Sequence, residues 1–374
     1  MNTELSSFAA RLRSWQTATT DGAARPPYQD SEFNSLALEL FALQFKYNFA
    51  YRKICEARKL TPLVVEHWTQ IPAVPTSAFK ELELTSLAPD ERIAVFHSSG
   101  TTEQKPSRHF HYAESLALYE ASLWSWFEQN FFAKPEVRSQ KPELLVLTPP
   151  PEQVPNSSLV HMFETVRQKT GAAKNIFTGK ISDGVWTLDF DATLAALSPR
   201  ASRLAPRALL VLGTAFSFVH LLDELVARDL RVALPAGSRV METGGYKNRS
   251  RVLPKAGLHT LITEQLGVSR ENIICEYGMS ELSSQAYDSE VRSQKSEVRS
   301  FQFPPWARVQ IISPESGLEV DDGETGLIRI FDLANVFSVA AIQTEDLGVR
   351  RGDGFELVGR AQLAEPRGCS LMTA

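Results

Sequence analysis

The sequence has few cysteines, no long apolar run and no excess of basic charge. Its three cysteines, Cys55, Cys275 and Cys369, cannot build a disulfide framework for 374 residues, so we expect a reducing cytoplasm. No apolar stretch approaches the roughly 20 residues of a membrane-spanning helix. The first residues lack the apolar core of a signal peptide. The net charge of −5 argues against nucleic acid as a partner.

Several catalytic motifs are also missing. The patterns GxSxG, HExxH and CxxC do not occur, so serine hydrolase, zinc protease and thiol-redox chemistry have no support. Hydrophobic residues make up 43% of the chain and charged residues 22%, which excludes a largely disordered protein. The length allows about two domains and a large core without disulfides.

The middle of the chain predicts an α/β fold. Residues 143–150 and 208–214 are apolar runs typical of buried strands, 217–230 is an amphipathic helix, and 231–235 is a third strand. A strand, a helix and a strand in that order favour a βαβ unit and a parallel sheet. Residues 272–278 predict a further strand of this sheet.

The flanking regions are predicted to differ from this middle. The first 30 residues are polar and irregular, and Asp30 or Ser31 is a candidate cap for a long helix whose apolar stripe ends at Ile54. Two prolines exclude regular structure in 71–80. After Phe301, short strands alternate with turns that contain Gly or Asp, as in an antiparallel β-subdomain.

One polar hexapeptide is repeated. EVRSQK occurs at 136–141 and at 290–295, where it continues as SEVRS over 296–300. A shared polar segment at two places in a packed fold indicates inserted low-complexity sequence in exposed loops. We therefore expect a short deletion there to be tolerated.

A small, hydroxyl-rich loop follows the predicted strand IAVF. It contains Ser99, Gly100, Thr101 and Thr102, and Lys105 adds a positive charge. Backbone N–H groups and hydroxyls in such a loop can surround phosphate oxygens. The pattern is not a Walker P-loop, because GxxxxGK[ST] is missing. It favours phosphate binding, with a flexible Ser/Thr turn as the alternative.

Two later segments carry further candidates. CEYGMSEL (275–282) places Tyr277 and Glu281 at a strand-to-loop junction, where a ring can stack on a base and a carboxylate can hold Mg²⁺. In TEDLGVRRGDGFELVGR (344–360), Asp346 precedes a Gly-rich turn and can accept hydrogen bonds from two ribose hydroxyls. The alternatives are a tyrosine packed at a sheet edge and an ordinary hairpin.

Together these segments match one superfamily in order and spacing. SSGTTEQKPSR resembles the phosphate-binding motif of the adenylate-forming enzymes, which include acyl-CoA synthetases, nonribosomal-peptide adenylation domains and luciferases. EYGMSE resembles their adenine and magnesium motif. TEDLG, followed by DGFELVGR, resembles their ribose-binding and hinge segment. The resemblance covers roughly Ile71 to the C-terminus.

Within this superfamily the chain resembles the acyl-protein synthetase family of the LuxE type. IPAVPTSAFK precedes the phosphate loop, KPSR follows it, and METGGYKNRSR (241–251) resembles the family's Gly-Gly-aromatic-Lys segment. The sequence stops at Ala374, just past the hinge, so the C-terminal domain of ordinary superfamily members is expected to be absent.

The resemblance implies a particular organisation. We expect an α/β fold whose adenylate-forming core has two α/β sheets and a distorted β-subdomain from about residue 301. A helical N-terminal segment over 1–70 packs on this core, which spans 71–360. A tail over 361–374 carries Cys369.

The resemblance also implies ATP and Mg²⁺ as cofactors and assigns roles to matching residues. The ATP phosphates are expected to be held by Ser99, Gly100, Thr101, Thr102 and the catalytic Lys105. Adenine is expected to contact Tyr277, the ribose Asp346, and the ribose or hinge Arg360. Glu281 is expected to hold Mg²⁺, and His161 is expected to contact the acyl substrate. Two positions depart from the motif, since Glu103 replaces the usual Gly and Ser280 the more frequent Thr.

The implied reaction is activation of a carboxylic acid. A carboxylate is a poor acyl donor. An acyl-adenylate, in contrast, readily transfers its acyl group to an attacking thiolate and releases AMP. The resemblance implies a fatty acid as substrate, a thioester on Cys369 and delivery to a partner such as an acyl reductase. Cys275 is expected to be structural, because its strand is predicted to be buried.

Two alternatives stay open. The adenylate can instead pass to coenzyme A, a carrier-protein thiol or an amine. The chain can also be a nucleotide- or acyl-binding protein that has lost catalysis, for which the negative charge of Glu103 beside the phosphate loop is the motive.

Overall fold

The computed structural model describes residues 2–17, 28–98, 105–132, 142–171, 175–197, 207–245, 250–293 and 296–361. Its helices are α1 (Thr3–Thr17), α2 (Asp30–Tyr47), α3 (Phe49–Ala57), α4 (Ala78–Glu81), α5 (Ala113–Phe132), α7 (Ser158–Thr170), α8 (Phe190–Leu197), α9 (Ala215–Ala227) and α10 (Lys255–Leu266). None of these described helices has the length and apolar character needed to cross a membrane.

Most of the strands belong to one sheet. The described strands are β1 (Val74–Pro75), β2 (Ala94–His97), β3 (Arg108–His111), β4 (Glu143–Val146), β5 (Asn175–Phe177), β6 (Gly179–Ser182), β7 (Val185–Leu188), β8 (Leu209–Thr214), β9 (Arg239–Thr243), β10 (Ile273–Tyr277), β11 (Ala286–Ser293), β12 (Ser296–Gln302), β13 (Ala307–Ile312), β14 (Thr325–Asp332), β15 (Ala341–Arg351) and β16 (Gly354–Arg360). Most of them join one large mixed sheet in the order β13-β14-β15-β16-β12-β11-β10-β9-β8-β4-β5, with β1 beside β15.

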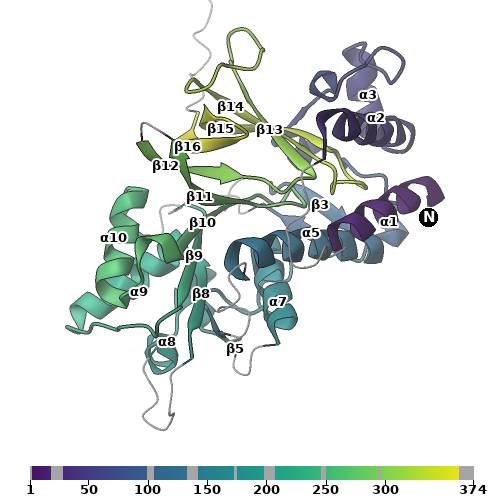
Figure 1. Cartoon of the computed structure of the whole chain (residues 1–374). Helices are drawn as coiled ribbons and strands as arrows, with labels where there is room; N and C mark the ends of the chain where they lie inside the picture. The colour runs from purple at the N-terminus through teal and green to yellow at the C-terminus, as the bar shows by residue number, and fades with distance from the viewer. Residues whose placement is uncertain are drawn as a thin grey trace, which may run out of the picture.

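One half of this sheet is parallel and is covered on both faces. Strands β5, β4, β8, β9 and β10 are parallel neighbours, and alternate side chains of each strand point to opposite faces. Val211 and Val240 pack with α9 and α10, while Leu210 and Met241 pack with α5 and α7 (Figure 1). Burial on both faces explains why these strands are continuous apolar runs.

The predicted βαβ unit is present, but its second strand was placed wrongly. After β8 and α9 the chain returns through β9 at 239–243, not through 231–235. The backbone N–H groups of Val232 and Leu234 instead donate to the carbonyls of Gln265 and Leu266 at the end of α10. The apolar run at 231–235 therefore lies against a helix end rather than in the sheet.

The other half of the sheet is antiparallel. The direction changes where β10 pairs with β11, at Glu276 opposite Tyr287, and the strands from β11 to β16 and on to β13 are antiparallel neighbours. The α/β fold class is thus confirmed. The two expected sheets are, however, joined in one path, because the β11–β12 hairpin pairs with β10 on one side and with β16 on the other.

The second copy of the repeated hexapeptide lies in this hairpin. The register sets Glu290 opposite Arg299 and Arg292 opposite Glu297, so two identical SEVRS segments run antiparallel as neighbouring strands. The prediction of an exposed loop is wrong for this copy, whereas the first copy, at 136–141, lies outside the described residues.

The N-terminal region departs from the sequence prediction in two places. Residues predicted to be irregular form α1, whose Leu5, Phe8 and Leu12 are buried at helical spacing. The single long helix is split at Asn48, whose side chain accepts a hydrogen bond from the Tyr51 N–H and caps α3.

The proline-rich segment is partly regular, contrary to expectation. Val74 and Pro75 form β1, which pairs in parallel with Ile342 and Gln343 of β15. The two-residue strand sits at a sheet edge, where the missing N–H of a proline is tolerated.

Gly179 is expected to be essential for packing at the end of β4. A Cβ added there would lie well under 3.0 Å from backbone atoms of Thr148. We predict that Gly179→Ala lowers the free energy of unfolding by about 1–3 kcal/mol, the usual cost of overpacking. Gly257→Ala is the control, because a Cβ at this helical position would make only an ordinary contact, 3.8 Å from Pro254 Cδ, and the free energy of unfolding should rise by about 0.5–1 kcal/mol. Equal thermal unfolding temperatures for the two variants would contradict the prediction.

Candidate active site

Three of the predicted nucleotide residues lie together where β10 ends beside β15 and β16. The Tyr277 hydroxyl donates a 2.8 Å hydrogen bond to Asp346 Oδ2, and Arg360 Nε lies 3.5 Å from Asp346 Oδ1. Asp346 and Arg360 are direct cross-strand neighbours. The motifs that contain Tyr277 and Asp346 are 69 residues apart in the sequence, and they therefore meet at the carboxylate of Asp346.

The ring of Tyr277 packs in a group of three phenylalanines. Its centroid lies 5.2 Å from that of Phe355, 5.9 Å from Phe301 and 6.3 Å from Phe303. Burial, and then the charge of Asp346, raise the pKa of the Tyr277 hydroxyl well above its ordinary value. The tyrosine therefore stays neutral and acts as a hydrogen-bond donor to Asp346.

The phosphate-loop segment begins and ends on a two-stranded hairpin formed by β2 and β3. The Ser98 N–H donates to the Ser107 carbonyl at 3.3 Å, and the Ser107 N–H donates to Ser98 Oγ at 3.0 Å. These two bonds close the neck of the loop. The predicted Ser99, Gly100, Thr101 and Thr102 lie outside the described residues.

Lys105 is described, at the end of the loop. Its Nζ lies 3.6 Å from Glu81 Oε2, and both side chains are largely exposed. An exposed pair of this kind contributes little to stability. Movement of the lysine side chain away from Glu81 and toward an anion would therefore cost little free energy.

The neck of the loop contacts the motif that contains Glu281. Ser107 Oγ lies 3.3 Å from Ser280 Oγ, which donates a 3.0 Å hydrogen bond to Glu281 Oε2. His109 Nδ1 lies 2.9 Å from the Ser280 carbonyl, and burial lowers the pKa of His109 to about 4. His109 is thus neutral at neutral pH, and the loop neck and Glu281 form one hydrogen-bonded unit.

Glu281 is the residue that fits a metal role. Its side chain is buried, and its backbone carbonyl is fixed by a 2.8 Å hydrogen bond from Asn335 Nδ2. Among the described residues no three His, Cys, Asp or Glu side chains are grouped closely enough to hold an ion. Mg²⁺ is commonly held by one or two carboxylates together with substrate phosphates, which is the donor set that Glu281 beside the predicted phosphate loop would offer.

The remaining candidates are placed as follows. His161, on α7, lies 3.1 Å from Glu120 Oε1, and its ring packs on Phe96 of β2, the strand that leads into the loop. Burial raises the pKa of the Cys275 thiol well above its ordinary value, so this cysteine is not a thiolate at neutral pH. Cys369 lies outside the described residues.

Asp288 was missed by sequence reasoning, and no motif marks it. Its buried carboxylate accepts from the Cys275 N–H at 2.6 Å and from Arg299 at 2.9 Å, and Lys255 Nζ lies 2.7 Å away. Burial acts to raise the pKa of Asp288, but these partners outweigh it and hold the pKa below its ordinary value. The carboxylate thus links β10, β11, β12 and α10 at Cys275, two residues before Tyr277.

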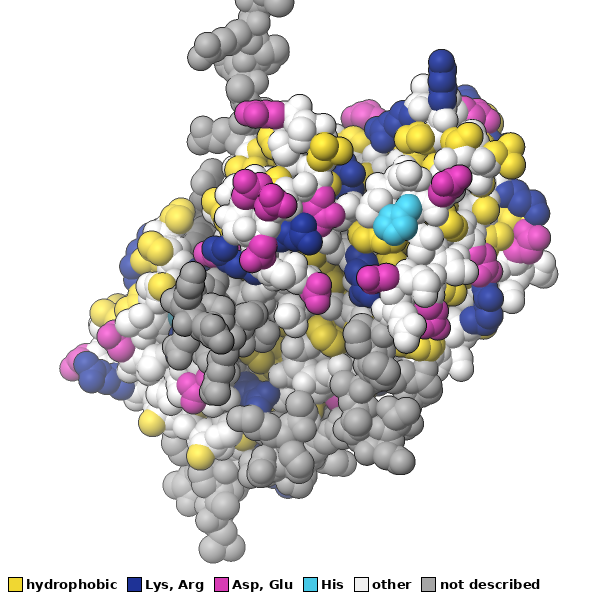
Figure 2. All heavy atoms as spheres, turned by 45° about the horizontal axis from the view of Figure 1, so that its top comes forward, with side chains coloured by type: hydrophobic (Ala, Val, Ile, Leu, Met, Phe, Trp, Pro, Cys, Tyr) yellow, Lys and Arg dark blue, Asp and Glu magenta, His cyan; other side chains and the backbone are white. Residues whose placement is uncertain are grey.

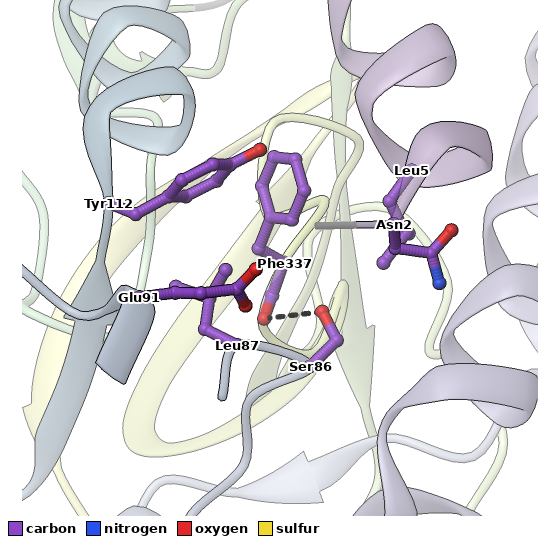
Figure 3. Close-up of a pocket in the computed structure, with 7 residues that line it drawn as sticks. All are labelled: Asn2, Leu5, Ser86, Leu87, Glu91, Tyr112 and Phe337. Carbon is purple, nitrogen blue, oxygen red and sulfur yellow. Dashed lines mark hydrogen bonds between the residues drawn. The ribbon is translucent and has the colours of Figure 1, made fainter. Parts of the chain in front are cut away.

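The surface gives less information than these contacts. A pocket between α1 and the segment before β2 is lined by Asn2, Leu5, Ser86, Leu87, Glu91, Tyr112 and Phe337 (Figure 3). Its volume of about 10 Å³ suits no more than a water molecule, and none of the predicted nucleotide residues lines it. Acidic and basic side chains are interspersed over the face shown in Figure 2.

Comparison with known proteins identifies the family. The family model for acyl-protein synthetase, LuxE, matches residues 27–109 and 172–374, which is most of the chain. The chain belongs to the acyl-protein synthetase family, LuxE. The predicted recognition and the predicted enzyme class, an adenylate-forming ligase, are thereby confirmed.

Two curated relatives of this acyl-protein synthetase are long-chain-fatty-acid–luciferin-component ligases. The one from Aliivibrio fischeri is 24% identical over 364 residues, which cover 91% of this chain and 87% of the relative. The one from Vibrio harveyi is 25% identical over 343 residues, covering 88% and 84%.

Solved structures share the fold. A 2-hydroxyisobutyryl-CoA ligase in complex with 2-HIB-AMP, in its postadenylation state, superposes with a TM-score of 0.65 at 12% identity. The match covers 93% of this chain and 74% of that one. An open conformation of the same ligase gives 0.63 at 13% identity, covering 92% and 75%. At such identities the likeness shows the adenylate-forming fold alone.

Asp288 yields a stability prediction. Asp288→Asn leaves Lys255 and Arg299 without their carboxylate and should lower the free energy of unfolding at neutral pH by about 3 kcal/mol. Because the folded-state pKa is lowered, this contribution is present above the unfolded value of about 4 and is lost as the pH falls through the folded value. Thermal unfolding of both proteins between neutral and acidic pH measures this.

The control for this variant is Asp191→Asn. Asp191 pairs with Arg228 at 3.3 Å on the surface, where an ion pair contributes at most about 1 kcal/mol. Equal destabilisation by the two substitutions, or a difference between wild type and Asp288→Asn that persists at acidic pH, would contradict the buried-carboxylate interpretation.

Proposed function

We propose that this acyl-protein synthetase activates a fatty acid with ATP and holds the acyl group as a thioester on Cys369. The observation that carries the proposal is the convergence of two hydrogen-bonded units at the end of β10. One contains Tyr277 and Asp346, and the other joins Ser107 to Glu281. A nucleotide that spans these units has its nucleoside at the first and its phosphates at the second.

The proposed nucleoside contacts follow from chemistry at these side chains. Asp346 offers carboxylate oxygens to two ribose hydroxyls, and Arg360 lies close enough to orient that carboxylate. Tyr277 would present the ring on which adenine stacks, and the rings of Phe355 and Phe301 pack against it at interplanar angles of 78° and 57°. Bound nucleotide would thus replace solvent at the side chain of Arg360, which is 80% exposed, and at that of Asp346, which is 20% exposed.

The proposed phosphate contacts involve the loop closed by Ser98 and Ser107. Ser99, Gly100, Thr101 and Thr102 would supply N–H groups and hydroxyls, and Lys105 would exchange its weak contact with Glu81 for the phosphates. Glu281 would hold Mg²⁺, which neutralises charge that develops on the phosphates during transfer.

The proposed chemistry has two steps. A carboxylate oxygen of the fatty acid attacks the α-phosphorus of ATP, and pyrophosphate leaves. A thiolate then attacks the carbonyl carbon of the acyl-adenylate, and AMP leaves with the bonding electron pair. Both curated relatives are named as ligases of a long-chain fatty acid, which supports a fatty acid here. The thioester would serve a partner such as an acyl reductase.

Asp346 provides a test of the nucleotide site. Asp346→Asn should raise the KM for ATP about tenfold or more, because a charged acceptor of ribose hydrogen bonds is lost, while the KM for the fatty acid stays within about twofold. ATP–pyrophosphate exchange at varied ATP measures this. Glu345→Gln is the matched control, since successive residues of β15 point to opposite faces. An unchanged KM for ATP in Asp346→Asn would exclude it from the ribose site.

Cys369 provides a test of the acceptor. Incubation with Mg²⁺, ATP and a fatty-acid panel should give wild type an acyl adduct that hydroxylamine removes, visible by intact-protein mass spectrometry. Cys369→Ser should lack the adduct and still form AMP, and Cys275→Ala should retain it because that thiol is buried. AMP formation without any adduct on wild type would move the acceptor outside the chain, to coenzyme A, a carrier protein or an amine.

A further inference from the structure

The turn that carries Glu281 is held by side chains at the end of β14 and in the loop that follows it. Asn335 Nδ2 donates a hydrogen bond to the Glu281 carbonyl at 2.8 Å. The Ser283 N–H donates to Asp332 Oδ2 at 3.0 Å, and the Ser284 hydroxyl donates to Asp332 Oδ1 at 2.8 Å. Residues 281–284 are therefore bonded to two side chains of one short segment.

These two side chains are themselves fixed. Asp332 and Asn335 are buried, at 0% and 1% exposure. The Ala334 N–H donates to Asp332 Oδ1 at 2.9 Å. The amide of Gln44, on the N-terminal helix α2, donates to the Asn335 carbonyl at 2.7 Å and accepts from the Ala340 N–H at 3.1 Å. The loop between β14 and β15 is thus anchored to α2, and a group that positions a functional residue needs such support.

The amide of Asn335 fits its surroundings in one orientation. Its Nδ2 donates to the carbonyls of Glu281, at 2.8 Å, and of Val339, at 3.0 Å. An amide oxygen in that place would meet only acceptors, so the nitrogen must face them. The bond to Glu281 therefore depends on an N–H donor, which neither a carboxylate nor an apolar side chain supplies.

The position of this turn matters because of the metal proposed for it. Mg²⁺ requires ligand oxygens at about 2.0–2.1 Å in near-octahedral geometry. Glu281 Oε2 accepts from the hydroxyl of Ser280, its neighbour in the same turn. A shift of the turn would therefore displace the carboxylate together with its hydrogen-bond donor, and the carboxylate would no longer meet this narrow requirement.

We propose that Asn335 and Asp332 are positioning residues for the metal carboxylate, because they hold the backbone of 281–284 in the place that lets Glu281 bind the Mg²⁺ that accompanies ATP. The inference rests on the proposed function, since it takes Glu281 as the metal ligand. It adds a role for the loop between β14 and β15, and for its anchor on α2, in metal binding.

The test measures how Mg²⁺ changes the binding of α,β-methylene-ATP, a nonhydrolysable analogue, to the full chain. Isothermal titration calorimetry gives the Kd with Mg²⁺ and with EDTA. Asn335→Leu, which has a similar volume and no donor, should weaken binding with Mg²⁺ about tenfold and change the Kd in EDTA by less than about twofold, since loss of a group that orients a metal ligand commonly costs at least this much metal affinity. Glu281→Gln should lose at least as much.

Asn48→Leu is the matched control. Asn48 is also a buried asparagine, and its Nδ2 donates to the Ser338 carbonyl of the same loop at 3.3 Å. Its other described bond caps α3, at Tyr51, and not the turn of Glu281. Thermal unfolding should show a loss of stability in this variant, whereas its Kd with Mg²⁺ should stay within about twofold of wild type.

Asp332→Asn keeps the inference testable if Asn335→Leu does not fold. Each carboxylate oxygen of Asp332 accepts one backbone N–H, from Ser283 or from Ala334, so the amide leaves one of them without an acceptor. We expect this variant to bind the analogue with Mg²⁺ at least about threefold more weakly and to be unchanged in EDTA.

Two kinds of result separate this inference from the proposed function. If Glu281→Gln keeps the full effect of Mg²⁺, Glu281 is not the metal ligand, and both the proposed metal role and this inference fail. If Glu281→Gln loses the effect while Asn335→Leu and Asp332→Asn keep it, the inference alone is overturned. Equal weakening of Asn335→Leu with Mg²⁺ and in EDTA, or a tenfold loss in Asn48→Leu, would also overturn it.

Discussion

The structure depends on the point at which β10 stops pairing in parallel with β9 and starts pairing antiparallel with β11. A change of direction inside a sheet interrupts the ladder, and here the Cys275 N–H donates to the side chain of Asp288 rather than to a strand carbonyl. A buried carboxylate is costly unless it is paired. Arg299 and Lys255 pair it, and in doing so they bind β12 and α10 to the same point.

That fixed point also separates two environments at one strand end. Tyr277 and Glu276 are consecutive, so their side chains leave β10 on opposite faces. Tyr277 enters the aromatic group of Phe301, Phe303 and Phe355 in the antiparallel half. Glu276 faces the side chains under α5 and α7, where its carboxyl group accepts a hydrogen bond from the Thr243 hydroxyl.

Local chemistry in the sequence was sufficient for most elements of the core. The apolar runs of β4 and β8 and the amphipathic α9 were predicted because burial on one or two faces leaves a periodic pattern. The pattern failed at 231–235, because an extended apolar run against the end of α10 is indistinguishable from a strand. It failed at Asn48, because the cap that splits the helix depends on a tertiary contact, in which Asn48 Nδ2 donates to the carbonyl of Ser338.

The site shows the same division. Tyr277, Asp346 and Glu281 were predicted as site residues because their motifs are short and local, whereas Asp288 belongs to no such pattern and acquires its properties only by burial and pairing. The repeated SEVRS segments show the reverse case. They were noticed in the sequence, but their meaning as complementary strands required the register.

The contact between the loop neck and Glu281 shows why the motifs must act together. Ser107 and Ser280 are 173 positions apart, yet their hydroxyls are within hydrogen-bond distance, and Ser280 also donates to Glu281. The described residues at the neck of the loop, Ser98 and Ser107, are thereby joined through Ser280 to the carboxylate proposed for Mg²⁺. The hydroxyl of Ser280 is sufficient for this link, so serine in place of the more frequent threonine preserves the connection between Ser107 and Glu281.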